Sequence, residues 1–411
     1  MTTAWHIITS EYPPQPGGVS DYTYQVAAAL AAEGDEVHVW CPPATEETPR
    51  SAGVIVHREL GSIAPADLRR VGRQLDQFAV PRRLLVQWVP HGYGYRSMNV
   101  SFCLWLLSRA KLRGDRVEVM FHEPFFAFIR QSWKQNAAAV VHRLMTMLLL
   151  QAAHHAWISI PAWEPMLRPY ALGRAVPFAW LPVPSNIAAS DDSAGISAIR
   201  AHYAPPGGLL VGHFGTYGQS IKETLMAVLP ALLSGEEKLA LLLLGRGSEG
   251  VREELSRRHP HLAPRLHALS GLAAEDVARH ISACDVMLQP YPDGISARRT
   301  SAMASLANGR PVITTSGRIT ESLWAASGAV VLTPDGDAAA MTRATKRLLS
   351  DAAERQRLSA TAHALYQSRF DLRHVVAGLR ARMTKGAGDE HPWPMPAHEI
   401  TGGGISADSG H

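Results

Sequence analysis

The sequence has few cysteines and no long uncharged apolar run. The three cysteines, Cys41, Cys103 and Cys284, show no Cys-x-x-Cys spacing, which is typical of free buried thiols in a reducing compartment. No stretch reaches the roughly 18 uncharged apolar residues of a membrane-spanning helix. The amino-terminal segment also lacks the basic region of a signal peptide. These absences predict a cytoplasmic, soluble protein.

Charge and motif content exclude several function classes. The formal net charge is only +4 and there is no Lys/Arg-rich run, so nucleic acid is not an expected partner. The zinc motif HExxH and other metal-ligand spacings are absent, so we expect no metal and no other cofactor. The GxGxxG fingerprint is absent too, which disfavours a nicotinamide enzyme.

What the sequence does contain is an alternation of short apolar runs with helical patterns, and this alternation occurs twice. The first series runs from residue 4 to about 155, and the second restarts at 208 after a Pro-rich segment, 177–195, that we read as an interdomain connection. Such alternation indicates βαβ units and parallel sheets. We therefore predict an α/β protein of two Rossmann-like lobes facing a central cleft, with ligands beyond the carboxyl ends of the strands.

We divide the chain into four parts. We place an amino-terminal lobe at 1–185, a carboxyl-terminal lobe at 186–366, a helix packing back on the first lobe at 367–385, and a disordered tail at 386–411 that is rich in Gly, Pro and polar residues.

Two loops of the first lobe carry candidate site residues. Gly17 and Gly18 open a helix after a strand and a Pro-rich loop, where backbone N–H groups suit a phosphate or a sugar hydroxyl. The alternative is a tight turn that simply needs glycine. His122 and Glu123 follow a predicted central strand. A histidine there can donate to a hydroxyl or phosphoryl oxygen and can titrate near neutral pH, although an ordinary loop histidine fits as well. Asp21, in the first turn of the helix that Gly17 and Gly18 open, is a further polar candidate of these loops.

The second lobe repeats the strand–glycine–helix theme. Gly215 and Thr216 lead into a helix that carries Lys222, a point charge suited to a diphosphate. The alternative for Lys222 is a solvated helix lysine. Gly245 and Arg246 follow the next strand and, with Tyr291, are candidates for contact with a nucleotide.

An unusual helix start follows a third strand of this lobe. Arg298, Arg299, Thr300 and Ser301 crowd its predicted first turn, where acids normally suit the helix dipole. Guanidinium groups, hydroxyls and backbone N–H groups together would make an anion site. A solvated Arg pair with Ser/Thr caps is the alternative.

These parts together resemble a retaining glycosyltransferase of the GT-B fold, glycosyltransferase family 4 (glycosyl transferases group 1). The resemblance covers about residues 4 to 385 and rests on "PPQPGGVSDYTYQ", "GTYGQSIKETL", "LLLLGRG" and "LANGRPVITT" in this order. It implies a nucleotide-diphosphate sugar donor, bound mainly by the second lobe, and an acceptor hydroxyl in the first, without a metal. By the same resemblance, Gly17 and Gly18 lie beside the donor phosphates and the acceptor, His122 touches the donor sugar, and Lys222 holds the diphosphate. We assign Asp21 and Glu123 to the acceptor.

The sequence departs from the family pattern at three positions. Thr216 stands where the family usually has an arginine, and Ser296 and Ala304 occupy the positions of its Glu-x7-Glu pair. We hypothesise that Arg298 and Arg299 supply the displaced diphosphate-binding charge, with Thr300 and Ser301 donating to the β-phosphate. A non-catalytic GT-B binding or scaffold protein remains the main alternative. An epimerase or a phosphorylase on the same fold is another, but no lysine stands in a recognisable pyridoxal phosphate context.

The resemblance implies attack by an acceptor hydroxyl on the same face that the diphosphate leaves. The acceptor class stays open between a carbohydrate, a lipid-linked and a small molecule. The stretches 101–113 and 125–135 combine apolar and basic residues, which suits peripheral contact with the inner face of a membrane. Helices that turn these residues into the core are the alternative.

Overall fold

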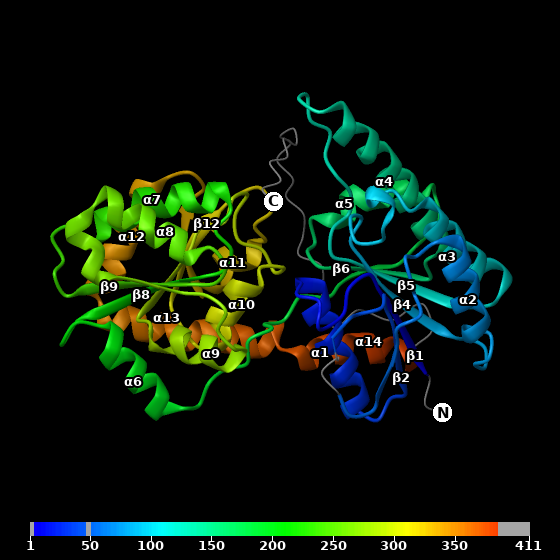
Figure 1. Ribbon diagram of the computed structural model, residues 1–411, viewed down its shortest axis with the longest axis horizontal. Helices are drawn as coiled ribbons and strands as arrows, with labels where there is room; N and C mark the ends of the chain where they lie inside the picture. The colour runs from blue at the N-terminus through cyan, green and yellow to red at the C-terminus, as the bar shows by residue number, and fades with distance from the viewer. Residues whose placement is uncertain (1–3, 47–50, 385–411) are drawn as a thin grey trace. The chain divides into compact units, whose positions relative to one another are not determined.

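The computed structural model describes residues 4–46 and 51–384 and divides them into two compact units (Figure 1). The first unit runs to Val183 and includes the chain from Leu372, and the second runs from Pro184 to Asp371. Each unit is an α/β structure built on one parallel sheet, so the predicted fold class is confirmed. The tail predicted at 386–411 lies outside the described residues.

The first unit contains a seven-stranded sheet in the order β3-β2-β1-β4-β5-β6-β7, and all neighbours are parallel. Its central strands are buried along nearly their whole length, as in a sheet that is covered on both faces. The strands are β1 (Trp5–Thr9), β2 (Val37–Trp40), β3 (Val54–His57), β4 (Arg83–Trp88), β5 (Arg116–Phe121), β6 (His155–Ile158) and β7 (Phe178–Trp180).

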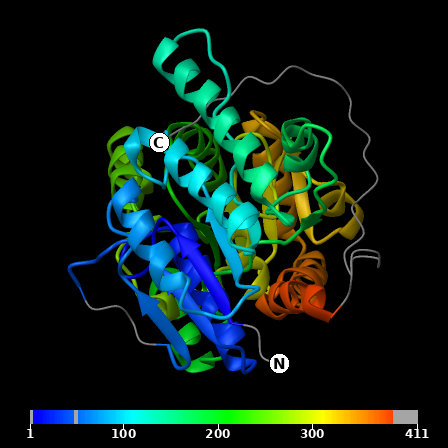
Figure 2. The ribbon, with the colours of Figure 1, turned by 90° about the vertical axis from the view of Figure 1, so that its right-hand side faces the viewer.

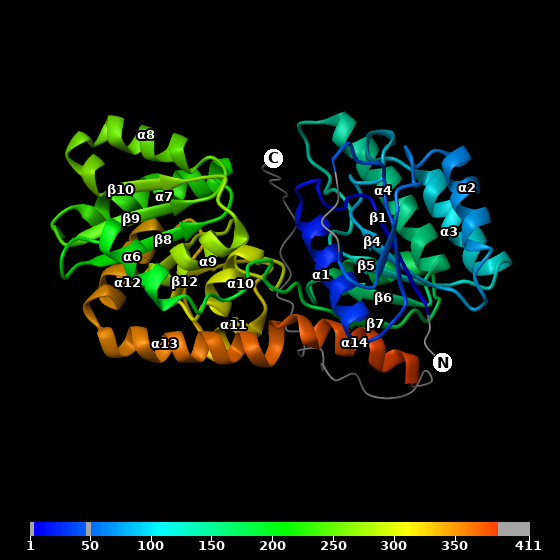
Figure 3. The same ribbon diagram turned by 60° about the horizontal axis from the view of Figure 1, so that its bottom comes forward.

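Helices cover both faces of this sheet. The helix α14 (Leu372–Thr384) lies beside α1 (Gly18–Ala32) on one face (Figure 3). There Val375 and Leu379 join the same apolar core as Val26 and Leu30. Arg83 donates to the backbone oxygen of Leu379, so α14 is held by a polar contact as well. The remaining helical segments are α2 (Pro65–Leu75), η1 (Tyr95–Ser97), α3 (Val100–Leu112), α4 (Trp133–Ala152), α5 (Trp163–Leu167) and η2 (Arg168–Ala171).

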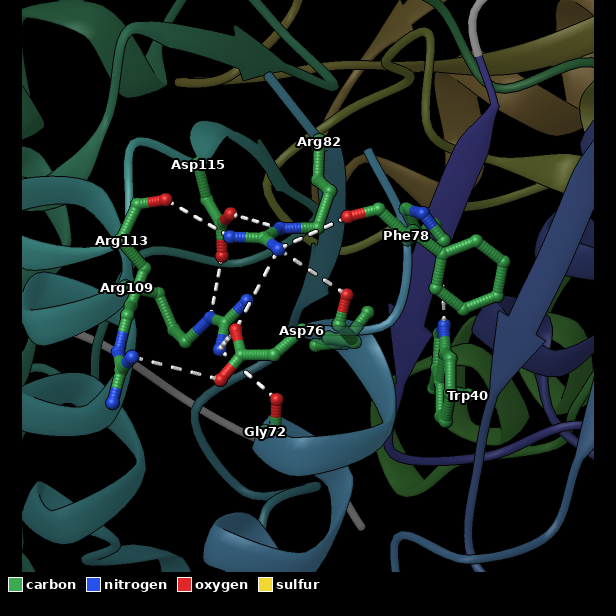
Figure 4. Close-up of polar contacts among 10 residues, drawn as sticks. Trp40, Gly72, Asp76, Phe78, Arg82, Arg109, Arg113 and Asp115 are labelled. Carbon is green, nitrogen blue, oxygen red and sulfur yellow. Dashed lines mark hydrogen bonds and ion pairs between the residues drawn. The ribbon is translucent and has the colours of Figure 1, made fainter. Parts of the chain in front are cut away.

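A buried ionic network lies at the amino-terminal edge of this sheet (Figure 4). Arg82 and Arg109 both donate to the carboxylate of Asp115, whose side chain is fully buried. Arg109 also donates to Asp76 (2.7 Å) and to the backbone oxygen of Gly72. Because Arg82 and Asp115 directly precede β4 and β5, the network joins α2 and α3 to the strands at the edge opposite to their carboxyl ends.

The second unit contains a six-stranded parallel sheet in the order β10-β9-β8-β11-β12-β13. Its core is almost entirely aliphatic, with leucines of β9 packed against α7, α8 and α12. The strands are β8 (Leu209–Phe214), β9 (Leu239–Leu244), β10 (Leu266–Leu269), β11 (Val286–Gln289), β12 (Val312–Ser316) and β13 (Val330–Pro334). The helical segments are α6 (Ser193–Tyr203), α7 (Gln219–Leu233), α8 (Ser248–Arg258), η3 (Pro260–Arg265), α9 (Ala274–Ala283), α10 (Thr300–Ala307), α11 (Ser322–Ser327), α12 (Ala338–Ser350), α13 (Ala352–Leu365) and η4 (Tyr366–Phe370).

The segment 177–195, predicted as a connection, contains regular structure. Residues 178–180 form β7, which pairs with β6 at the edge of the first sheet, and α6 begins at Ser193 with Asp192 as its cap. The sequence analysis missed this strand because prolines flank it, although an edge strand leaves one side of its backbone unpaired and tolerates a proline next to it.

In the described part of the chain, no helix is both long and apolar enough to cross a membrane.

Candidate functional site

The start of α1 brings Gly17 together with an acid that the sequence did not single out. The carboxylate of Glu11 accepts hydrogen bonds from the backbone N–H groups of Val19 (3.0 Å) and Ser20 (2.9 Å). A Cβ at Gly17 would lie 2.4 Å from a Glu11 oxygen, so a larger residue there would displace this carboxylate, whereas Gly18 borders open space. Since Glu11 already occupies two helix N–H groups, this end of α1 suits a hydroxyl that donates to the carboxylate better than a phosphate.

His122 lies just past β5, as predicted, but its ring is buried. The ring contacts Tyr22 with the centroids 4.9 Å apart, and its Nε2 lies 2.8 Å from Oε1 of Gln87. Burial lowers the pKa of His122 to about 3, so the expectation that it titrates near neutral pH is wrong. A neutral ring that donates from Nε2 to Gln87 keeps its lone pair on Nδ1.

Two polar groups beside His122 have no hydrogen-bond partner within the described residues. They are the hydroxyl of Tyr22 and Nε2 of Gln87, and both are buried. A buried polar group without a partner costs about 1–3 kcal/mol, and two such groups around one histidine ring suit a place that receives a ligand or water. Gln87 carried no signal in the sequence, because it stands inside an otherwise apolar strand.

The two predicted acceptor residues lie near this place but are less buried. Glu123 follows His122, and its carboxylate is 3.7 Å from Nδ1 of His91. Asp21 is the acidic residue in the first turn of α1 and is half-buried.

In the second unit, the loops after β8 and β9 meet at two glycines. Gly245 has φ 113°, and a Cβ on it would lie 2.2 Å from the backbone oxygen of Gly215. A Cβ on Gly215 would in turn lie 3.4 Å from Oγ of Ser301. The structure therefore brings Gly215, Gly245 and the start of α10 together. Because the two glycines have no Cβ, a ligand can approach their backbone atoms closely.

The helix α10 starts later than the sequence suggested. It begins at Thr300, and Arg299 is its capping residue, so the two arginines precede the first turn. The guanidinium of Arg299 lies 4.9 Å from the ring centroid of Tyr291, whose hydroxyl is 2.7 Å from Oγ of Ser301. Tyr291, a predicted nucleotide contact, is 4% exposed, and burial raises its pKa to about 12. In this structure Tyr291 supports Arg299 and Ser301.

Lys222, the predicted diphosphate ligand, lies in the first turn of α7 and forms an ion pair with Glu254 of α8 (2.6 Å). The hydrogen bond from Lys222 lowers the pKa of this glutamate. Glu254 also pairs with Arg258, so it would keep a cation if Lys222 turned away. Thr216 and Arg246 both have exposed side chains.

A buried carboxyl group that the sequence analysis missed lies beside the position of a missing glutamate. Ser296 and Ala304 are fully buried, but Glu321, beyond β12, accepts from the backbone N–H of Ala297 (2.9 Å) and from Nε1 of Trp324 (2.7 Å). Burial raises the pKa of Glu321 to about 7, against the opposing effect of these donors and of the Arg298 charge. The sequence feature that could have indicated Glu321 is an acid within a few residues of a buried strand, in "SGRITE".

In the ranges 4–46 and 51–384, no three or more His, Cys, Asp or Glu side chains are arranged to hold a metal ion.

The strand ends and loops of the second unit lie in the part of the chain that matches a known family. Residues 206–351 match glycosyl transferases group 1. This stretch contains Gly215, Lys222, Gly245 and the start of α10. No curated protein matches the chain.

Solved glycosyltransferases share the architecture of the chain at low identity. Sucrose-phosphate synthase from Thermosynechococcus elongatus is 16% identical, covers 93% of this chain and 98% of its own, and has a TM-score of 0.67. WaaG, a glycosyltransferase involved in lipopolysaccharide biosynthesis, is 15% identical over 93% and 100% of the two chains (TM-score 0.65). Anabaena Alr3699/HepE in complex with UDP-glucose is 15% identical over 92% and 99% (TM-score 0.64). These likenesses show the GT-B fold, and with the family match they support a glycosyltransferase.

Proposed function

We propose that this protein transfers a sugar from a nucleotide-diphosphate sugar to an acceptor hydroxyl, with retention of anomeric configuration and without a metal. The observation that carries the proposal is the arrangement of Gly215, Gly245 and Ser301 around the start of α10, inside the stretch that matches the family. Anabaena Alr3699/HepE binds UDP and UDP-glucose, which supports a donor of this class for the present chain.

The diphosphate would lie at the start of α10. The N–H groups at the start of a helix carry a partial positive charge, and Thr300 and Ser301 add hydroxyl donors. Arg298 and Arg299 precede the turn, and the position of Arg299 over Tyr291 limits the freedom that its guanidinium would lose on binding. The glycines at 215 and 245 would let phosphate oxygens reach the backbone.

Lys222 would join the site by exchanging partners. Its ion pair with Glu254 is half-exposed, and such pairs contribute little to stability, about 0–1 kcal/mol. A diphosphate carries more negative charge than one carboxylate, so Lys222 is attracted more strongly to the diphosphate than to Glu254. Arg258 would then neutralise Glu254.

The acceptor would use the polar groups beside His122 in the first unit. A sugar hydroxyl can accept from Nε2 of Gln87 and bond to the hydroxyl of Tyr22, which satisfies both buried groups. Glu11, Asp21 and Glu123 offer carboxylate oxygens to further hydroxyls. The acceptor is thus a hydroxyl-rich molecule: a carbohydrate, a lipid-linked sugar or a small glycoside.

We infer that the acceptor hydroxyl attacks on the face from which the diphosphate leaves, and that a phosphate oxygen takes its proton. The C–O bond from sugar to diphosphate breaks as the new glycosidic bond forms. The cations and helix N–H groups stabilise the charge that develops on the leaving group. Detection of a covalent glycosyl–enzyme would contradict this scheme.

We place the reaction in the cytoplasm. The support is that Cys41, Cys103 and Cys284 are all buried free thiols in the structure, which suits a reducing compartment. We also propose peripheral contact with the inner face of a membrane, for which the apolar and basic stretches of the first unit are the support.

A second candidate is a GT-B protein that binds a nucleotide sugar without transferring it. One observation favours it: Ser296 and Ala304, which stand in place of two acids, are buried and offer no carboxylate to a ribose or a sugar.

The deciding experiment is a thermal-shift panel of nucleoside diphosphates and nucleotide sugars, followed by an assay of nucleotide release. We expect one nucleotide sugar to stabilise the protein. Arg298→Ala and Arg299→Ala should each weaken its binding about tenfold, as expected for a lost charge-assisted hydrogen bond. Arg347→Ala, an exposed arginine of α12, is the control. Binding without nucleotide release across an acceptor screen would favour the second candidate, and the absence of any binding would refute both.

A further inference from the structure

Large apolar side chains that face solvent gather on one part of the first unit. They lie on α4, on the loop before it and on the neighbouring helix α3, and include Leu104, Phe128, Trp133, Val140 and Leu144. Among the described residues of the second unit, no large apolar side chain is exposed to a comparable degree. Single apolar side chains such as Ile55, Val80 and Leu172 are exposed elsewhere in the first unit, but α4 and the loop before it carry four of them together.

The exposed residues of α4 form one stripe. Trp133 is 76% exposed, Val140 58% and Leu144 41%, and their spacing places them on one face of the helix. The opposite face packs Met145 and Leu149 into the unit. Figure 2 shows the first turns of α4 standing clear of the other helices of the unit. Such a helix is apolar on both faces, although it covers the core with only one.

The same surface is basic and almost free of acids. Between residues 124 and 163 there is no Asp or Glu, whereas Arg130, Lys134 and Arg143 lie there. Arg130 and Lys134 are exposed, and the guanidinium of Arg143 lies 4.0 Å from the ring centroid of Phe128. The cations therefore flank the apolar stripe without being neutralised by acids of this segment.

We propose that the outward face of α4 and the loop before it, residues 128–144, dock on an anionic lipid surface. The apolar stripe would enter the region between headgroups and acyl chains, where tryptophan is favoured. Arg130 and Lys134 would lie against lipid phosphates, at about 1 kcal/mol for each cation. A second copy of the chain fits less well, because two such faces would bring their cations together with no acid between them.

This docking specifies the surface that carries the proposed membrane contact, and it does not depend on the transfer reaction. A helix that lies in the interface needs no spanning length, in agreement with the absence of a spanning helix from the described residues. It would hold the first unit beside a lipid-linked acceptor and raise the local concentration of that acceptor.

The test is co-sedimentation of the full chain with vesicles of equal parts phosphatidylglycerol and phosphatidylcholine, compared with phosphatidylcholine alone. We expect binding to the anionic vesicles that weakens with added salt. The triple variant Trp133→Ser, Val140→Ser, Leu144→Ser should bind more than tenfold more weakly, since it removes most of the inserted apolar area. Arg130→Gln with Lys134→Gln should weaken binding about twenty-five-fold, because each lost charge weakens it about fivefold.

Matched controls come from exposed residues elsewhere. Leu172→Ser, at a residue 66% exposed in the same unit, and Arg347→Gln in the second unit should leave vesicle binding unchanged. All substituted side chains are at least partly exposed. The variants should therefore have the same midpoint of thermal unfolding as the parent protein, and they should bind nucleotide equally well.

Three results would overturn the inference. They are no binding to anionic vesicles, binding that the triple variant retains, and a dimer in sedimentation velocity that the triple variant abolishes. The last would make a second copy of the chain the occupant. None of these results bears on nucleotide-sugar binding, which the thermal-shift panel measures separately.

Discussion

Single buried titratable residues give this protein its expected pH dependence. In the first unit, burial together with the charges of His38, His57 and Arg82 lowers the pKa of His6 to about 3. In the second unit, burial raises the pKa of Glu321 to about 7. The two shifts act in opposite directions on stability, and their pH windows overlap between about 4.5 and 6.5, so each is measured as the difference between the parent protein and its own variant.

The first prediction concerns His6. An unfolded histidine binds its proton near pH 6.5, whereas folded His6 does so only near pH 3. The stability that its neutral form provides is therefore complete above pH 6.5 and is lost as the pH falls toward 3, at up to about 1.4 kcal/mol per pH unit. Urea unfolding of the first unit between pH 7 and 5 should show this loss, and His6→Asn should reduce the slope.

His91→Asn is the control for this measurement, because the His91 side chain is 55% exposed. It should keep the slope of the parent protein. Equal slopes for His6→Asn and the parent protein would contradict the prediction.

The second prediction concerns Glu321. Its pKa is higher folded than unfolded, so its contribution is complete below the unfolded pKa, near 4.5, and is lost as the pH rises through about 7. Relative to Glu321→Gln, the parent protein should lose about 2 kcal/mol between pH 5 and 8. Urea unfolding monitored in the second unit measures the difference. Parallel curves for the two proteins would show that the carboxyl group does not titrate in this range.

At the scale of elements, helices and strands are joined by buried ionic contacts as well as by apolar packing. The carboxylate of Asp115 holds two guanidinium groups, which in turn bind the ends of α2 and α3 (Figure 4). Removing one partner from such a network leaves buried charge uncompensated.

The third prediction follows from this network. Asp115→Ala should lower the free energy of unfolding by about 3–5 kcal/mol, because Arg82 and Arg109 would stay buried without their shared acid. Glu164→Ala, which breaks the more exposed i,i+4 pair with Arg168, should cost less than about 1 kcal/mol. Equal losses in urea unfolding would mean that the network contributes no more than a surface pair.

The sequence predicted long, strongly periodic elements well and short ones poorly. The strands β1, β4 and β9 were found because each is a run of buried apolar residues, and α7 because its pattern is helical over four turns. The edge strand β7 was missed because it has only three residues between prolines. The start of α10 was placed too early because the arginines before it suit a helix as well as a loop.

At the scale of the whole molecule, the chain crosses from the first unit to the second and returns. The return segment, α14, packs Val375 and Leu379 into the core of the first unit and accepts a hydrogen bond from Arg83. The first unit is therefore incomplete without the carboxyl-terminal helix, although this helix lies far away in the sequence.

The fourth prediction tests this dependence. A chain that ends at Asp371 should unfold its first unit at a lower urea concentration, since it exposes apolar residues of α1 and leaves Arg83 without the Leu379 oxygen. We expect a loss of several kcal/mol, in line with about 25 cal/mol per Å² of apolar area. A chain that ends at Thr384 is the control and should match the full chain. Nucleotide binding by the second unit should persist in both.

The sequence by itself determined the fold class, because the period of apolar residues and the position of glycines act locally. It also placed His122, Lys222 and the residues at 298–301 near strand ends. Only the tertiary structure decided the partners and the protonation of these groups. The neutrality of His122, the ion pair of Lys222 with Glu254, and the Glu321 carboxyl beside position 296 depend on residues far apart in sequence. Burial and charge are set by such neighbours, and a local pattern does not contain them.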